Sequence, residues 1–142
     1  MVQRSASAEW RGGLKDGKGQ LKTESGAVQG NYSFSSRFES GTGTNPEELI
    51  AAAHAGCFSM ALAAALGRAG HEPKRIHTTA KVTLDKTDAG FAITGIALDT
   101  EAQVPGIAEA AFKEVAEDAK KNCPVSKALA ATKITLNARL AG

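Results

Sequence analysis

TNPEELIAAAHAGCFSMAL, at residues 44–62, contains the start and the body of one long apolar helix. Asn45 is a preferred N-cap residue, Pro46 suits the first helical position, and two glutamates follow in the first turn, where negative charge is favourable. Apolar residues then occupy every side of the helix as far as about Gly70. A helix of this kind is covered all round. We therefore expect a long, buried central helix, thin enough through its many alanines to pack against a copy of itself.

The sequence on both sides of this helix predicts strands, a hairpin and two further helices. Alternating apolar and polar residues indicate strands, and turn residues such as Asp-Gly and Ser-Gly separate them. The expected strands are Ser5–Trp10, Gly19–Glu24, Ala27–Phe38, Ile76–Lys86, Phe91–Thr100 and Thr132–Leu140, and the later helices begin near Val104 and Pro124. The expected order is β-β-β-α-β-β-α-α-β, an α+β fold. We expect a single domain over residues 1–142, with an antiparallel sheet packed on the central helix.

Composition and charge argue against several classes of protein. Hydrophobic residues form 42% and charged residues 23% of the 142 residues, as in ordinary globular domains. A net charge of +2 from scattered Lys and Arg is too small for a nucleic-acid-binding surface. The N-terminus lacks the apolar segment of a secretion signal, so we expect a cytoplasmic protein. His54 and Ser59 interrupt the one long apolar run, which favours a core helix over a membrane span.

The two cysteines are the residues best suited to chemistry. Persistent disulfides are rare in a reducing compartment, so Cys57 and Cys123 are either small buried apolar residues or redox-active thiols. Cys57 lies in the middle of the apolar helix, where a lone cysteine is usually inert. Cys123 precedes Pro124 and so lies near a helix N-cap, where amide N–H groups lower a thiol pKa. Arg37, at the end of an aromatic strand, is the best candidate for the positive group that a peroxide-reducing thiolate needs.

The sequence resembles the OsmC (osmotically inducible protein C) and organic hydroperoxide resistance (Ohr) family of peroxidases, and within it the OsmC branch. The resemblance extends along nearly the whole chain and is carried above all by TNPEELIAAAHAGCFSMAL and the later CPVS. It implies that Cys57 is the reactive cysteine, Cys123 the resolving cysteine, and Arg37 and Glu47 their active-site partners.

The same resemblance implies an intertwined homodimer that reduces hydroperoxides, preferably organic ones, without a metal or other cofactor. The resemblance also implies that external dithiols reduce the oxidised enzyme, and these are of the dihydrolipoamide type in the Ohr branch. Helix geometry supports the dimer independently. Glu47 and Cys57 are ten positions apart on the expected helix, a rise of about 15 Å. Glu47 therefore cannot help the thiol of its own chain, and if both residues belong to one site, Glu47 and Arg37 come from the partner subunit.

Two other functions remain open on the sequence alone. His54, Cys57 and Cys123 could supply ligands to a zinc ion, although no Cys-x-x-Cys pair is present. A non-catalytic dimer could instead bind a small apolar molecule, with incidental thiols. For the peroxidase, apolar neighbours of the thiol would favour an alkyl hydroperoxide over hydrogen peroxide. These neighbours are Leu49, Ile50, Phe58 and Met60.

Overall fold

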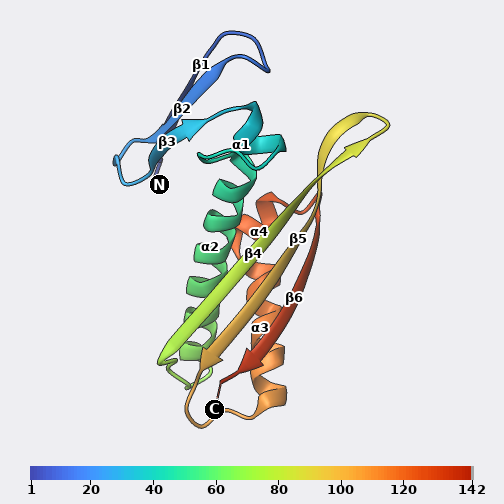
Figure 1. Cartoon of the computed structure of the whole chain (residues 1–142). Coiled ribbons are helices and arrows are strands. Elements are labelled where there is room, and N and C mark those ends of the chain that lie inside the picture. Colours follow the sequence, from blue (N-terminus) through green and yellow to red (C-terminus); the bar gives the residue numbers. More distant parts are fainter. Residues whose placement is uncertain (142) are drawn as a thin grey trace. The chain divides into compact units, whose positions relative to one another are not determined.

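The structure is a computed structural model in which residues 1–141 are described. The chain divides into two compact units, Met1–Leu49 and Ile50–Gly142. The first unit, blue to cyan in Figure 1, contains β1 (Ala6–Arg11), β2 (Lys18–Thr23), β3 (Gln29–Tyr32) and α1 (Phe34–Phe38). Helix α2 (Pro46–Arg68) has its first turn in this unit and the rest in the second. The second unit adds β4 (Arg75–Thr87), β5 (Gly90–Gln103), α3 (Glu109–Asn122), α4 (Pro124–Ala128) and β6 (Lys133–Leu140).

The first unit is built on an antiparallel sheet in the order β1-β2-β3. Trp10 of β1 and Tyr32 of β3 both pair with Gly19 of β2. Their ring centroids are 5.3 Å apart, and a Cβ atom on Gly19 would collide with both rings. The glycine therefore allows the two aromatic rings to meet across the central strand. The strands expected at Ser5–Trp10 and Gly19–Glu24 are confirmed, with ends shifted by one residue.

The third expected strand is wrong in its second half. The sequence predicted one strand over Ala27–Phe38, but its last five residues form the helix α1. Ser33 caps this helix: its hydroxyl accepts a hydrogen bond from the N–H of Ser36, whose hydroxyl accepts one from the N–H of Ser33. The rings of Phe34 and Phe38 lie 4.9 Å apart. A spacing of four places side chains on one face in a strand and in a helix alike, so the aromatic pattern could not separate the two.

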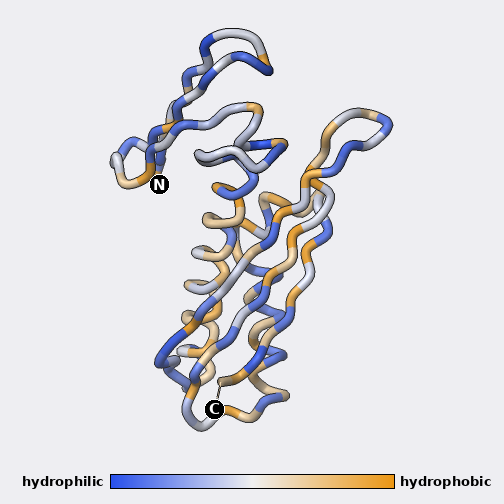
Figure 2. The backbone as a smooth tube through the Cα atoms, in the orientation of Figure 1, coloured by the Kyte–Doolittle hydropathy of each residue, from blue (hydrophilic) through white to orange (hydrophobic). Residues whose placement is uncertain are grey.

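The second unit is built on a sheet in the order β4-β5-β6. The expected hairpin is confirmed, because β4 and β5 pair in antiparallel over their whole length. The expected fully antiparallel sheet is wrong, because β6 pairs with β5 in parallel. A parallel pair needs a crossover connection, which α3 and α4 supply between β5 and β6. Figure 2 shows hydrophilic and hydrophobic residues alternating along these strands, as in a sheet with one face packed on a core.

The core of the second unit lies between this sheet and the helices α2 and α3, which lie on the same face of the sheet in Figure 1. Its largest fully buried side chains are Phe58, Leu62 and Leu66 of α2, Phe112 of α3, and Ile96 and Leu98 of β5. Residues 1–141 therefore form an α+β fold with two sheets and four helices, one helix more than the sequence predicted.

Within the single chain, helix α2 is buried on one side only, and the expectation of a helix covered all round stays a prediction that a second copy of the helix would have to meet. Its opposite side exposes a run of apolar and small residues: Ala52, Ala53, Gly56, Met60, Ala64 and Gly67. Met60 is 77% exposed. The sequence could not distinguish the two sides because both are apolar. Among residues 1–141, α2 is the one helix with the length and composition of a membrane span, and the core helix of a soluble protein satisfies the same criteria.

Candidate active site

The two cysteines, distant in sequence, lie next to each other in the second unit. Cys57 is in the middle of α2, and Cys123 lies between α3 and α4, where Pro124 begins the next helix. Both thiols are free. Their Sγ atoms are 2.9 Å apart, and the Cys123 thiol donates a hydrogen bond to Cys57. Because the sulfurs of a disulfide are about 2.05 Å apart, an approach of about 0.9 Å would join them.

The two thiols have different environments and opposite pKa shifts. Burial raises the pKa of Cys57, the hydrogen bond with Cys123 raises it further, and the N–H of Val125 opposes both effects. For Cys123, burial acts to raise the pKa, but the hydrogen bond with Cys57 and the polar groups of Ser126 and Val125 outweigh it and lower the pKa. The lowered pKa of Cys123 agrees with its predicted place at a helix start. Within this unit the environment therefore favours the thiol form of Cys57 and eases ionisation of Cys123.

Exposure distinguishes the two thiols as well. Cys123 is fully buried, whereas Cys57 is partly exposed. Cys57 lies on α2 beside the exposed apolar side of the helix, three positions before Met60 and four after Ala53. A small molecule in solution therefore reaches Cys57 before Cys123. Phe58, which the sequence grouped with the neighbours of the thiol, points instead into the core and is 0% exposed.

A second contact joins the same two helices one turn away from the cysteines. The Nε2 atom of His54, three residues before Cys57, lies 2.7 Å from the hydroxyl of Ser126, three residues after Cys123. His54 is 0% and Ser126 6% exposed. Burial lowers the pKa of His54, so the imidazole is neutral at pH 7. The sequence offered His54 as a possible zinc ligand and did not single out Ser126, although its spacing from Cys123 places it in the first turn of α4.

Arg37 and Glu47 form an ion pair in the first unit. Arg37 lies on α1 and Glu47 in the first turn of α2. The guanidinium donates two parallel hydrogen bonds to the carboxylate, Nε to Oε1 at 3.0 Å and Nη2 to Oε2 at 2.9 Å. The bond to Glu47 raises the pKa of Arg37. Glu47 is buried, and the side chain of Arg37 is 36% exposed.

The loop between α1 and α2 is fixed by hydrogen bonds to both helices. The hydroxyl of Ser36 donates to the carbonyl of Thr44 at 2.7 Å. The side-chain amide of Asn45 donates to the carbonyl of Ser36 at 3.0 Å, and its oxygen accepts from the N–H of Glu48 at 2.8 Å. The predicted N-cap role of Asn45 is confirmed. These bonds orient α1 against the first turn of α2, and so bring Arg37 to Glu47. The four predicted site residues thus form two pairs, one in each unit.

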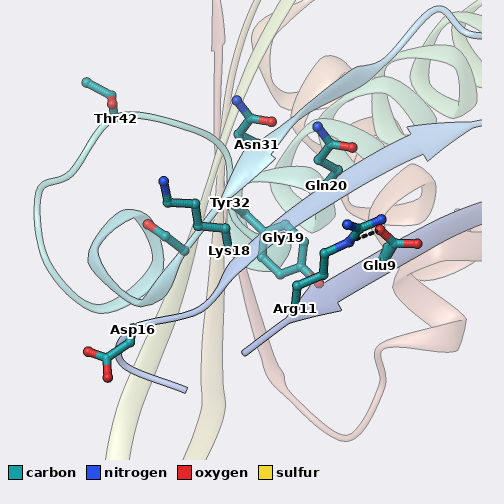
Figure 3. Close-up of a pocket in the computed structure, with 10 residues that line it drawn as sticks. Glu9, Arg11, Asp16, Lys18, Gly19, Gln20, Asn31, Tyr32 and Thr42 are labelled. Carbon is teal, nitrogen blue, oxygen red and sulfur yellow. Dashed lines mark hydrogen bonds and ion pairs between the residues drawn. The ribbon is translucent and has the colours of Figure 1, made fainter. Parts of the chain in front are cut away.

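The other candidate sites have less support. Within residues 1–141, no three His, Cys, Asp or Glu side chains are grouped closely enough to hold a metal ion, and the Nε2 of His54 is engaged by Ser126. A hollow of about 800 Å³ in the first unit is lined by charged and polar groups, among them the exposed ion pair of Arg11 and Glu9 shown in Figure 3. Such a lining does not suit an apolar ligand.

Comparison with known proteins shows the family. The family model described as "OsmC-like protein" matches residues 39–138. The chain is 54% identical over 140 residues to "Peroxiredoxin OsmC" of Escherichia coli (strain K12), which covers 98% of this chain and 97% of that protein. The chain belongs to the OsmC-like protein family.

Solved structures share the OsmC-like fold. A putative organic hydroperoxide resistance protein from Vibrio cholerae, with captopril bound in one of the active sites, is 28% identical, with a TM-score of 0.76 over 100% of this chain and 93% of that one. The organic hydroperoxide resistance protein OhrB of Bacillus subtilis is 26% identical, with a TM-score of 0.72 over 96% of this chain and 98% of that one. The α+β fold predicted from the sequence is therefore that of the OsmC-like family.

Proposed function

We propose that this protein is a thiol-dependent peroxidase that reduces organic hydroperoxides, and hydrogen peroxide more weakly. The observation that carries the proposal is the pair of free thiols with their sulfurs 2.9 Å apart, one partly exposed and one buried. The relatives, named as a peroxiredoxin and as organic hydroperoxide resistance proteins, support the same activity. The whole chain, residues 1–142, acts as one OsmC-like domain in a cytoplasmic homodimer.

The reaction proceeds in three balanced steps. The Cys57 thiolate attacks the terminal oxygen of ROOH, the O–O bond breaks, and the alkoxide takes a proton and leaves as ROH. The thiol of Cys123 then attacks the sulfur of the Cys57 sulfenic acid; a disulfide forms, and the hydroxyl leaves as water with the thiol proton. An external dithiol, of the dihydrolipoamide type, reduces the disulfide by thiol exchange and is itself oxidised.

Arg37 and Glu47 supply the charge that the first step needs. The second unit by itself raises the pKa of Cys57 and keeps the proton on it, so an attacking Cys57 needs a cation nearby. Arg37 provides a guanidinium whose orientation is fixed by two hydrogen bonds to Glu47. Beside Cys57 it would stabilise the Cys57 thiolate and the charge that develops on the leaving oxygen.

A homodimer accounts for the unpartnered side of α2. The exposed residues of that side are apolar or small, and Met60 alone is 77% exposed. A contiguous apolar surface of this kind marks an interaction site, and small residues allow a second copy of the helix to approach closely. In such a dimer the site consists of Cys57 and Cys123 of one chain with Arg37 and Glu47 of the other. The apolar interface beside Cys57 would also favour alkyl hydroperoxides.

Stopped-flow kinetics test this function. The reduced protein is mixed with cumene hydroperoxide or hydrogen peroxide, and the quenched product is analysed by mass spectrometry. We expect fast consumption of the organic peroxide, slower consumption of hydrogen peroxide, and loss of two hydrogens as the disulfide forms. Cys57→Ser should abolish consumption, while Cys123→Ser should consume one equivalent and stop at the sulfenic acid. No consumption by the wild-type protein would refute the peroxidase and favour a non-catalytic binding module.

A further inference from the structure

The hydrogen bond between His54 and Ser126 lies directly beside the cysteine pair and has no part in the cycle described above. It joins α2 to α4, as does the contact between Cys57 and Cys123, and the two contacts are three residues apart on each helix. Both of its side chains are buried. Burying two polar side chains costs desolvation free energy. The hydrogen bond between them offsets this cost and fixes their relative geometry.

Helix α4 depends on few contacts of its own. It has five residues, and its N-cap, Cys123, makes no side-chain cap hydrogen bond. An isolated helix of this length is not stable in water, so contacts with the rest of the unit determine where Cys123 points. The bond from His54 to Ser126 acts one turn beyond Cys123 and so fixes the rotation of α4 about its axis.

The hydrogen atoms of this contact can be assigned from what surrounds it. Among residues 1–141, the Nδ1 atom of His54 has no hydrogen-bond partner. A buried N–H without an acceptor is rarer in proteins than an acceptor without a donor, so the proton is on Nε2 and is donated to Ser126. The hydroxyl proton of Ser126 is then free to turn toward Cys123, whose sulfur lies close enough for Ser126 to stabilise its charge.

We propose that His54 and Ser126 are positioning residues for the resolving step: their hydrogen bond holds α4 so that Cys123 faces Cys57, and the Ser126 hydroxyl stabilises the attacking sulfur of Cys123. The proposal rests on the peroxidase function proposed above. Neither residue touches the peroxide, so the first step does not depend on them. The step that they serve forms the bond between the two sulfurs and releases water from the Cys57 sulfenic acid.

Rapid-quench mass spectrometry separates the two steps. One equivalent of cumene hydroperoxide is added to reduced protein, and the sulfenic and disulfide forms are followed in time. For Ser126→Ala and His54→Leu we expect sulfenic acid formation near the wild-type rate and disulfide formation slower by roughly tenfold to hundredfold, the effect of a small misplacement of a reacting group. Because the sulfenic acid persists, excess peroxide should convert more Cys57 to sulfinic acid.

Conservative variants separate positioning from general damage to the fold. Ser126→Thr keeps the hydroxyl, and His54→Gln keeps an N–H donor near the place of Nε2, so both should resolve within about threefold of wild type. Ser59→Ala is the control, because Ser59 is a half-buried serine of this unit that donates a hydrogen bond to another residue, Thr78, at 2.8 Å. If His54→Leu does not fold, His54→Asn replaces it as the test variant, because the Asn side chain is too short for its N–H donor to reach Ser126.

A measurement without peroxide distinguishes failure of this inference from failure of the peroxidase. The equilibrium between the dithiol and the Cys57–Cys123 disulfide is measured in glutathione buffers. We expect Ser126→Ala to shift it toward the dithiol by about tenfold, because Cys123 is less well aimed. In the Cys57→Ser background, thiolate absorbance should show a higher pKa for Cys123 when Ser126 is alanine. Folded Ser126→Ala and His54→Leu proteins with wild-type resolution and equilibrium would overturn the inference, whatever the peroxide kinetics.

Discussion

Arg37 is the side chain that, in the proposed site, stabilises the thiolate of Cys57. Its two parallel hydrogen bonds to Glu47 need a planar guanidinium, and a lysine ammonium cannot make both. Arg37→Lys should therefore lower the rate of Cys57 oxidation by at least about tenfold, comparable to the loss of one charge-assisted hydrogen bond. Stopped-flow rates measured across pH should also show the apparent pKa of Cys57 rising. Arg11→Lys, in the exposed ion pair with Glu9, is the control and should keep the wild-type rate; a full rate for Arg37→Lys would remove Arg37 from the site.

His54 makes the stability of the protein depend on pH. Burial lowers its pKa in the folded state below the ordinary value of about 6.5. Between the two values the unfolded chain binds more protons than the folded one, so the free energy of unfolding rises with pH. The contribution is complete above about pH 6.5 and is lost as the pH falls from there toward the lower folded value.

Melting temperatures of wild type and His54→Gln between pH 5 and 8 measure this effect. We expect the wild-type protein to lose more stability on acidification than the variant, by no more than about 1.4 kcal/mol per pH unit for one group. His77→Gln, at an exposed position on β4, is the control and should behave like wild type. Parallel curves for wild type and His54→Gln would mean that His54 does not titrate differently on folding.

At the scale of helices and strands, the predictions from the sequence were most accurate where a segment followed a single periodicity of apolar residues. The hairpin of β4 and β5 follows a clear alternating pattern and the helix α3 a clear helical one, whereas α2 was predicted from its start signals and its long apolar run. Helix α1 was missed because Phe34 and Phe38 fit both periods, and because its capping box has Ser36 where the usual sequence signature has Glu or Gln. The parallel pairing of β6 could not be read from its own alternation, because pairing depends on the route of the chain through α3 and α4.

The sequence suggested some residues of the candidate site and missed others. Cys57, Cys123, Arg37 and Glu47 are predicted site residues because their residue types carry chemistry and their motifs resemble those of a known family. Ser126 was missed because serines near helix starts are common and its partner, His54, is 72 positions away. Long-range contacts between ordinary polar residues leave no pattern in a single sequence.

The buried side of α2 should determine the stability of the second unit. Leu62 is 0% exposed and packs in the core between helix and sheet. Leu62→Ala should lower the free energy of unfolding by roughly 2–5 kcal/mol, from lost burial and the cavity left behind. Leu62→Met keeps the volume and should lower it by less than about 1.5 kcal/mol. Denaturant titration measures both, and equal effects of the two variants would argue against tight packing at this position.

At the scale of the whole molecule, the proposed site is divided between two chains. Two variants, each lacking one part of the site, test this division. Cys57→Ser removes the nucleophile but leaves Arg37, and Arg37→Ala removes the cation but leaves Cys57. Each variant alone should be nearly inactive. In a mixed dimer with shared sites, Cys57 of one chain meets Arg37 of the other, and one of the two symmetric sites is complete.

Mixing the two variants after unfolding and refolding them together should therefore restore activity. Random pairing makes about half of the dimers mixed, each with one complete site of two, so about a quarter of wild-type peroxidase activity should return. If Arg37 instead serves Cys57 of its own chain, no dimer in the mixture contains a complete site and no activity returns. A third variant ties the result to the apolar side of α2: Met60→Glu, placed in both chains, should prevent the dimer and abolish the recovery, because a carboxylate would be buried in an apolar interface without a partner. Recovery that persists when the chains are monomeric by sedimentation would contradict the shared site, whereas recovery that follows the fraction of dimer would establish it.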